Sequence, residues 1–431
     1  MKASNTISLG RKIGQIRNYM SISQKKLASD LKCSIATISR IENDQINCDS
    51  KMLKAIISSL GIEGAPLNKG RDAAFREQLY VWRKVIKDRR VNEARQMQEG
   101  LSVILNLPFE QDLIATYRLF EINLLIAEKK LTLAEEKLSY FDSFAESLSV
   151  ENLYHYYFNK GSLHMHQKQT EIALAYSLIA LAYSLNSNEL DIHNFEEEAY
   201  LYYNIAVCYS QLGMPFRSTR YIKQASALIY DDRASVLGLY LDNLLASNYM
   251  RTGEEALALE LFDKCIVRAR SIGYQLYIGI ALHNLGCLCL KANELKQAMN
   301  YFDQAFEYFK MDDWFYLENM YFKIRCLIEL KEFSQCEEIL MNTKEIVNQN
   351  EKYQLLFNFL VHILSIKKES SRRYLIEIAI PHLVASNEYY KALDFCNVLE
   401  NYFTKRNIGR KSLEIAAISR DIYKKIIFGS V

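Results

Sequence analysis

Proline and glycine are scarce in this sequence of 431 residues, which has 4 prolines and 15 glycines. Because both residues interrupt regular structure, their scarcity favours long helices over many short strands joined by tight turns. No run of 18 apolar residues occurs, which argues against a membrane-spanning helix. The start, MKASNTISLGRK, lacks the apolar core of a secretory signal. We therefore expect a helical protein located in the cytoplasm.

Motifs of catalysis and cofactor binding are also lacking. The sequence contains no G-x-G-x-x-G, phosphate loop, H-E-x-x-H or G-x-S-x-G. His164 and His166 stand two residues apart, so on a helix they point to different faces and make a poor metal site. The nine cysteines are odd in number and scattered, which is typical of reduced thiols. We expect no cofactor, no bound metal and no enzymatic activity.

The first sixty residues contain signals for four short helices. Leu9, Ile13 and Ile16 recur at helical spacing and predict the first helix. The other helices begin at good N-cap residues. These are Ser23 before a helix with Leu27 and Leu31 on its buried face, Ser34 before Ile35–Glu42, and Asp49 or Ser50 before a helix that ends at Gly61. Two short helices around a tight turn, supported by flanking helices, are typical of a helix-turn-helix domain.

This segment resembles the Xre-type, phage-repressor-like helix-turn-helix. The matching pieces occur in the expected order. They are Leu9-Gly10 with Ile13 and Arg17, Ser23-Gln24 with Leu27-Ala28, Ser34 with Thr37 to Glu42, and Leu60-Gly61-Ile62. The resemblance implies a DNA-binding domain over residues 1–62. It also implies an internal ion pair between Arg17 and Glu42 that braces the first helix against the third.

The charge distribution agrees with a DNA-binding head. Residues 1–70 hold 11 lysines and arginines against 5 acidic residues, a net charge of +6. The remaining 361 residues hold 42 against 46, a net charge of −4. Lysines that only keep the surface soluble would be the simpler explanation of the basic head. Together with the motif, however, the asymmetry favours phosphate binding by the head alone.

The third helix of the head is predicted to lie in the major groove. Arg40 suits a bidentate contact with guanine, and Ile35, Ala36 and the Thr37 methyl suit thymine methyl groups. By resemblance, Gln24 reaches a phosphate or a base edge. The complete set of expected DNA contacts is Gln24, Lys25, Lys26, Ile35, Ala36, Thr37, Ser39, Arg40 and Asn43.

A repeat with a period of 40 follows a linker at residues 63–70, which contains two glycines and a proline. Its recurring positions are Ser218, Ala258 and Ala298, then Ile222, Phe262 and Phe302, then Ala225, Cys265 and Ala305. Such small-large-small spacing lets two helices pack closely and stack on the next pair. The pattern resembles the tetratricopeptide repeat (TPR), and a HEAT-like array is the alternative. We expect about nine helical pairs over 71–431, and hence an all-α fold with a helix-turn-helix domain before a TPR-like α-solenoid.

A TPR solenoid has a concave groove lined by the first helix of each pair. Asparagine recurs there, and a carboxamide can bind both the N–H and the C=O of an extended peptide. Aromatic neighbours would supply pockets for side chains. The expected groove residues are Phe158, Asn159, Tyr200, Tyr203, Asn204, Tyr240, Asn243, Arg251, His283, Asn284, Lys291 and Tyr321. The alternative is that these asparagines are ordinary polar residues of an exposed face.

A helix-turn-helix head before a TPR body resembles the RRNPP family of peptide-pheromone regulators, and its longer, NprR-type members above all. The resemblance implies a cytoplasmic, homodimeric transcription factor that binds an operator in double-stranded DNA. A short signalling peptide bound in the TPR groove would control it allosterically. Two alternatives remain open: a scaffold that sequesters a second protein such as a response regulator, and a repressor controlled by a non-peptide ligand.

Overall fold

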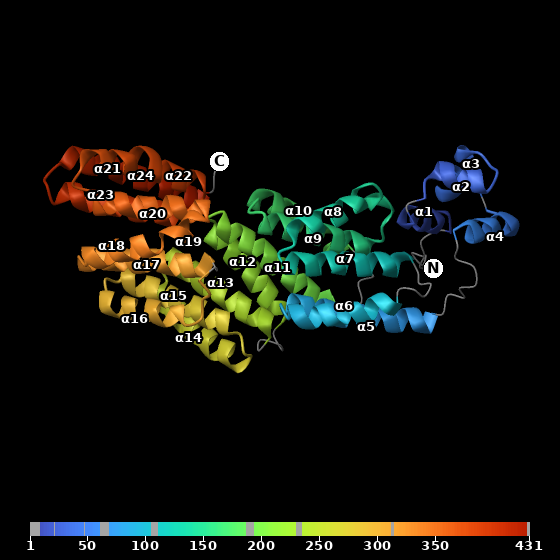
Figure 1. Ribbon diagram of the computed structural model, residues 1–431, viewed down its shortest axis with the longest axis horizontal. Coiled ribbons are helices and arrows are strands. Elements are labelled where there is room, and N and C mark those ends of the chain that lie inside the picture. Colours follow the sequence, from blue (N-terminus) through green and yellow to red (C-terminus); the bar gives the residue numbers. More distant parts are fainter. Residues whose placement is uncertain are drawn as a thin grey trace. The chain divides into compact units, whose positions relative to one another are not determined.

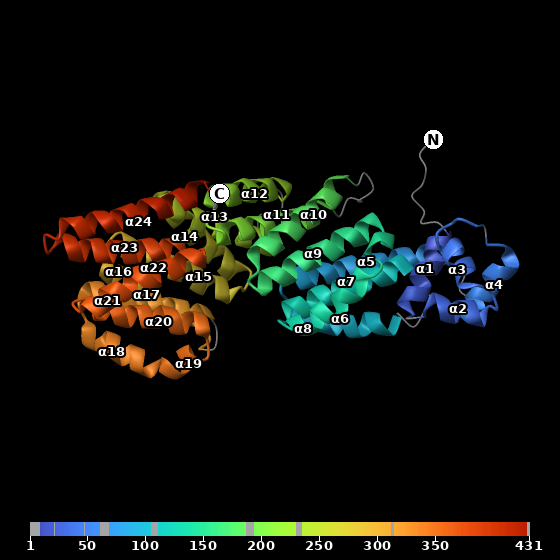
Figure 2. The same ribbon diagram turned by 90° about the horizontal axis from the view of Figure 1, so that it is seen from above.

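Helices make up the regular structure of the chain in the computed structural model, which describes residues 9–20, 22–46, 48–60, 69–104, 111–186, 194–229, 235–311 and 314–428 (Figures 1 and 2). They fall into two structural units, Met1–Asn194 and Phe195–Val431. The predicted all-α fold is thus confirmed. None of the described helices is long and apolar enough to cross a bilayer.

The head consists of α1 (Leu9–Tyr19), α2 (Gln24–Asp30), α3 (Ile35–Glu42) and α4 (Ser50–Ser59). The predicted caps are present. Ser23 Oγ accepts a hydrogen bond from the Lys26 backbone N–H at 3.0 Å, and the Asp49 carboxylate accepts one from Met52 at 2.7 Å. These caps satisfy N–H groups that the first turn of a helix leaves without partners.

The core of the head forms on the helix faces that the spacing predicted, with one exception. Ile13, Leu27, Ile38 and Ile41 are buried together. Leu9 is exposed instead, because it stands at the first position of α1. The predicted end of the fourth helix at Gly61 lies outside the described residues, as does most of the predicted linker at 63–70.

The first structural unit continues as three helical hairpins. They are α5 (Lys69–Lys87) with α6 (Val91–Ile104), α7 (Gln111–Ala127) with α8 (Leu131–Asp142), and α9 (Val150–His166) with α10 (Thr170–Asn186). A short 3-10 helix, η1 (Ala145–Ser147), precedes α9. Because α5 already begins at Lys69, helical structure starts within the segment predicted as a linker.

The second structural unit repeats the same arrangement. Its first hairpins are α11 (Asn194–Gln211) with α12 (Pro215–Leu228), α13 (Val236–Thr252) with α14 (Glu255–Ser271), α15 (Gln275–Lys291) with α16 (Leu295–Phe306), and α17 (Trp314–Leu330) with α18 (Phe333–Asn342). After α19 (Lys344–Asn348) come α20 (Glu351–Leu364), α21 (Glu369–Tyr374), the π-helical turn η3 (Leu375–Ala379), α22 (Ile380–Ala385), α23 (Tyr389–Thr404) and α24 (Gly409–Phe428).

The turns within the hairpins follow the 40-residue period. Gly213, Gly253 and Asn293 have left-handed backbone conformations, with φ of 73°, 85° and 62°. Each follows the first helix of its hairpin. A left-handed residue lets the backbone leave the helix sharply, and glycine and asparagine adopt it most readily.

The small-large-small positions form the contacts inside and between the hairpins. Ser218, Ala258 and Ala298 are fully buried, as are Ile222, Phe262 and Phe302. Phe302 leaves little free space, since a Cβ atom on Gly286 of α15 would lie 2.5 Å from its ring. The predicted packing positions are therefore confirmed.

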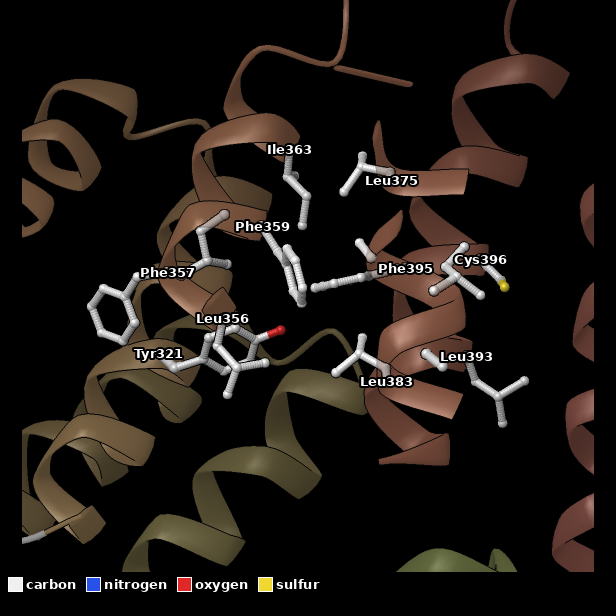
Figure 3. Packing of buried hydrophobic residues seen from close by; sticks show 14 of the residues in the cluster. Tyr321, Leu356, Phe357, Phe359, Ile363, Leu375, Leu383, Leu393, Phe395 and Cys396 are labelled. Carbon is white, nitrogen blue, oxygen red and sulfur yellow. The ribbon is translucent and has the colours of Figure 1, made fainter. Parts of the chain in front are cut away.

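The end of the chain has a larger apolar core between α17, α20, η3, α22, α23 and α24. Figure 3 shows Phe359 of α20 and Phe395 of α23 facing each other; their ring centroids are 5.7 Å apart in an edge-to-face arrangement. Aromatic pairs favour this geometry because the positive edge of one ring meets the negative face of the other.

Replacing Phe302 with alanine should destabilise the second unit. The side chain is fully buried against Gly286, so the cavity should cost about 3–5 kcal/mol of unfolding free energy. Urea unfolding followed by circular dichroism would measure this. Phe216→Ala, at an exposed phenylalanine of the same unit, is the control and should change the midpoint little. Equal effects of the two variants would contradict the packing role of Phe302.

Candidate nucleic-acid interface and candidate peptide site

The outer face of α3 presents the predicted base-reading residues. Ile35, Ala36 and Arg40 are exposed, and Thr37 is half-buried. Ser34 caps the helix by accepting a hydrogen bond from the Thr37 backbone N–H at 3.0 Å. Its hydroxyl also lies 2.8 Å from Thr37 Oγ1, so the side chain of Thr37 is partly engaged within the helix start. This face combines a cation with small apolar groups, which are the groups that read base edges.

An ion pair behind this face holds α1 against α3. Arg17 Nε donates to Glu42 Oε1 at 2.5 Å and Arg17 Nη2 donates to Glu42 Oε2 at 2.9 Å, with both side chains buried. This is the pair that the resemblance implied. Gln24 Nε2 donates to the same carboxylate at 2.7 Å. The Gln24 amide group therefore points into the head here, whereas we predicted a contact with a phosphate or a base edge.

The remaining predicted phosphate contacts lie around the ends of α2 and α3. Lys25 is exposed, and the exposed Lys26 ammonium group pairs with Asp30 at 3.0 Å. Asn43 Nδ2 donates to the Ser39 carbonyl at 2.8 Å, next to the end of α3. An exposed ion pair of this kind contributes little stability.

A row of tyrosines crosses α11, α13 and α15. The ring centroids of Tyr203 and Tyr240 are 5.6 Å apart, and those of Tyr240 and Tyr277 are 4.9 Å apart and stacked. Tyr203 and Tyr277 are half-buried, and Tyr240 is buried. Tyr277 was not among the predicted groove residues, although it follows Tyr240 at the same interval of 37 residues that separates Tyr240 from Tyr203. The buried Tyr200 lies on α11 near this row.

The predicted asparagines differ in their surroundings. Asn159 is fully buried; its Nδ2 donates to the Leu119 carbonyl at 2.6 Å, and its Oδ1 accepts from Asn123 at 3.2 Å. Its carboxamide therefore braces α9 against α7. Asn243 and Asn284 are half-buried, and Asn204 is buried but retains slight exposure. The Oδ1 atom of Asn243 is itself buried without a hydrogen-bond partner.

Several other predicted groove residues make internal contacts. The guanidinium of Arg83 lies 4.7 Å from the centre of the buried Phe158 ring. Arg251 donates to Ser210 and lies over the Tyr390 ring, 5.6 Å from its centre. Lys291 forms an exposed ion pair with Glu255 at 2.7 Å.

His283 is buried between helices. Its Nδ1 lies 3.0 Å from Asn319 Oδ1 and its Nε2 lies 3.6 Å from Cys287 Sγ. Burial lowers the pKa of His283 below its ordinary value, so the neutral ring is favoured. The ring therefore acts as a neutral polar group in the packing of α15 against α17.

A second set of polar groups lies on α17 and α23, and only Tyr321 among them was predicted as a site residue. Arg325 Nη2 donates to Asp394 at 2.7 Å, whereas its Nε and Nη1 are buried without partners. The hydroxyl groups of the buried Tyr321 and of Tyr390 also lack partners. Nearby, Lys391 pairs with Glu318 at 2.8 Å. Apart from Tyr321, no sequence signal indicated this set, because its two halves lie on helices about 70 residues apart in the chain.

A cavity of about 330 Å³ lies elsewhere, between α7 and α8 of the first unit. Apolar side chains such as Ile122, Phe141 and Phe144 line it, with Arg118 and Lys137 among the polar residues. None of the predicted site residues contributes to it.

Comparison with known proteins relates both parts of the chain to regulators. Residues 232–311 match the family model of the tetratricopeptide repeat, which decides between the TPR and HEAT alternatives. The chain is 23% identical over 411 residues to the transcriptional activator NprA of Geobacillus stearothermophilus, covering 91% of this chain and 98% of that protein.

Solved structures share the helical-repeat fold. The apo form of the quorum sensor NprR from B. thuringiensis matches with a TM-score of 0.63 at 18% identity, covering 82% of this chain and 99% of that one. NprR in complex with its cognate peptide NprX matches with a TM-score of 0.62 at 19% identity, covering 81% of this chain and 99% of that one. A Rap protein complexed with competence and sporulation factor matches with a TM-score of 0.70 at 16% identity, covering 82% of this chain and 99% of that one.

The stability of the second unit should fall as the pH falls below the ordinary histidine pKa. Since burial lowers the pKa of His283 in the folded chain, the unfolded chain binds more protons below about pH 6.5. The contribution of the neutral His283 ring to the free energy of unfolding is therefore complete above that pH and is lost on acidification. We expect the urea midpoint to decrease between pH 7.5 and 5.5, and to decrease less in His283→Gln. His164→Gln serves as the control; a pH dependence unchanged in His283→Gln would refute the assignment.

Proposed function

We propose that this chain is a peptide-controlled transcriptional regulator of the RRNPP family. Its helix-turn-helix head, its TPR body and its similarity to NprA along nearly its whole length support this. The head would bind an operator in double-stranded DNA. The inner face of the second unit would bind a short signalling peptide. The chain would act as a cytoplasmic homodimer.

The support for DNA binding is the combination of charge and exposure in the head. Residues 1–70 carry a net charge of +6, and α3 presents Arg40 with Ile35 and Ala36 on its outer face. The buried Arg17–Glu42 pair holds this helix in place without using its outer residues. We assign base contacts to Ile35, Ala36, Thr37 and Arg40. Phosphate contacts would come from Lys25, Lys26, Ser39 and Asn43.

The observation that carries the peptide proposal is the set of buried polar atoms without partners in the second unit. Those on α13, α17 and α23 are Asn243 Oδ1, Tyr321 OH, Tyr390 OH, and Arg325 Nε and Nη1; Ser419 Oγ of α24 is a further such atom and is not assigned to the peptide site. Buried polar atoms of folded proteins nearly always have partners, and each one without a partner costs about 1–3 kcal/mol. A peptide main chain carries both kinds of complementary group: its N–H groups would donate to Asn243, and its carbonyl oxygens would accept from the tyrosines and the arginine.

The row of Tyr203, Tyr240 and Tyr277 complements these groups by offering ring surface to the side chains of the peptide. Asn204 and Asn284 remain candidate contacts on the same helices. Asn159 and His283 are assigned to packing, because their polar atoms already have partners within the fold. NprR, a structural relative, has been solved with its cognate peptide.

Control by the peptide requires only that it bind one arrangement of the protein more tightly than another. A change from mostly inactive to mostly active needs several kcal/mol of differential affinity. Satisfying three or four buried polar groups provides a free energy of that order.

The scaffold alternative has support from the likeness of the fold to a Rap protein. A chain that only sequesters a second protein would bind no operator. DNA binding by the head therefore separates the two functions.

Arg40→Ala should weaken operator binding. Loss of a bidentate contact to a base should cost about 1–3 kcal/mol, or roughly 5- to 150-fold in affinity, and should relax specificity at one position. Selection of bound sequences from a random duplex pool, followed by anisotropy titration, would measure this. Arg270→Ala, an exposed arginine of α14, is the matched control. Sequence-independent binding by the wild type would count against the proposal.

Asn243→Ala together with Asn204→Ala should weaken peptide binding by about tenfold or more, since each lost hydrogen bond is worth about 1 kcal/mol. Calorimetry would use synthetic peptides from short secreted-type reading frames beside the gene. Asn300→Ala, an exposed asparagine on α16, is the control. Binding that survives the double substitution would remove this face from the proposed site.

A further inference from the structure

The outer face of α10 is apolar along its whole length. Its exposed residues are Ile172 (45% exposed), Ala175, Leu178 (36%), Ile179 (39%), Ala182 and Leu185 (63%). Glu171 at its start is the single charged residue in the 17 residues of this helix. A solvated helix face normally carries charged and polar side chains. This face is therefore typical of a contact surface.

The opposite face of α10 already has its partner. Ala173, Ser177 and Ala180 are buried on that side. The approach to α9 is close there: a Cβ atom on Gly161 would lie 2.6 Å from Ser177 Oγ. The exposed stripe is consequently a second surface, in addition to the one that closes the α9–α10 hairpin.

The central outer positions of the equivalent helices α12 and α14 are polar. The fully buried Ala173, Ser218 and Ala258 align α10 with α12 and α14. At the positions that hold Ala175, Leu178 and Ile179 in α10, α12 has Arg220, Lys223 and Gln224, and α14 has Glu260, Asp263 and Lys264, all exposed. These central positions therefore face solvent in the repeat. Of the three helices, α10 alone is apolar there, although α14 exposes Leu257 and Val267 at the positions of Ile172 and Ala182.

The sequence of the stripe indicates what covers it. The sizes of the stripe residues are symmetric about the midpoint between Leu178 and Ile179. These two large residues form the centre, and Ala175 and Ala182 lie at equal distances on either side. The large Ile172 and Leu185 lie at equal distances farther out. In an antiparallel pair of α10 helices related by a two-fold axis at this midpoint, Ala175 of one copy would face Ala182 of the other. Such pairing of one patch with itself is the arrangement of a two-fold symmetric interface.

The alanines make the pairing sterically favourable. They stand seven residues apart, so both lie on one side of the helix, two turns from each other. Small side chains at the contact let helix axes approach to the short end of the usual 8–10 Å range. The large residues at the centre and the ends would then fill the spaces beside the alanines. The stripe from Ile172 to Leu185 is about 20 Å long at 1.5 Å per residue, enough for a continuous helix pair.

We propose that the outer face of α10 is the surface through which two copies of this chain associate, antiparallel and around a two-fold axis between Leu178 and Ile179. This inference deepens the proposed function, which includes a homodimer, by assigning the contact to one helix. It requires neither peptide nor DNA.

The test uses charge reversal across the two-fold axis in the full-length chain. Ala175→Glu with Ala182→Glu places like charges opposite each other, as does Ala175→Lys with Ala182→Lys. Sedimentation velocity over a concentration series should show dimers for the wild type and a dissociation constant raised about tenfold or more for each double variant. An equimolar mixture of the two variants should restore the dimer, because opposite charges then meet.

Two controls separate loss of contact from loss of folding. Ala175→Glu with Ala182→Lys on one chain introduces as many charges but should dimerise, since each introduced carboxylate meets an introduced ammonium of the other copy. Glu260 and Val267 of α14 stand at the positions of Ala175 and Ala182 in α10. Val267→Glu therefore gives α14 the same pair of carboxylates, and the sedimenting species should keep the mass of the wild-type dimer. Glutamate and lysine are good helix formers, so α10 should stay folded.

Three results would overturn the proposal: a monomeric wild type, dimers of both like-charge variants at wild-type affinity, or a mixture that stays monomeric. A monomeric wild type would also contradict the homodimer of the proposed function, whereas the other two results would overturn only the assignment of the contact to α10. Peptide and DNA binding are judged by their own titrations.

Discussion

The close packing of small side chains against large ones is the constraint on which the rest of the body depends. Ala258, Phe262 and their counterparts in the neighbouring hairpins are fully buried. The side chain of Phe302 occupies the space where a Cβ atom on Gly286 would lie. Since a packed interior tolerates neither voids nor overlap, these positions set how each hairpin meets the next. Helix faces that do not take part in this packing remain free to carry function.

Polar residues of the first helices serve two purposes as a result. Where two hairpins meet, buried asparagines bridge them: Asn159 binds the Leu119 carbonyl, and Asn248 Nδ2 donates to Ser218 Oγ at 2.8 Å. These groups are satisfied and stabilise the stack. In the second unit, Asn243 Oδ1 and two nitrogen atoms of Arg325 are buried without partners. Because such atoms are costly, this is where a ligand with complementary groups would gain most.

The outer helices show the same freedom. Positions that face solvent in the repeat hold an ion pair in α14, where Lys264 contacts Glu260 at 2.5 Å, and a symmetric apolar stripe in α10. Both sequences satisfy the inner packing equally well. The repeat therefore determines that a helix forms and where it packs, while its outer residues determine whether it meets water or another protein.

Features that depend on local structure could be predicted from the amino-acid sequence. Ser23 and Ser34 cap α2 and α3 where predicted, because a cap involves only residues two or three positions away. The 40-residue period located the packing positions of α12, α14 and α16, because the same local spacing recurs in each hairpin. The surroundings of each polar side chain depend instead on how the helices pack, and could not be predicted in this way. Successive residues of a helix differ by 100° in direction, so neighbouring positions enter a seam or a groove according to the helix packed opposite. For this reason the Asn159 side chain bonds to the neighbouring helix, whereas the Oδ1 atom of Asn243 has no partner. For the same reason Arg325 pairs with Asp394, which is 69 residues away in the chain.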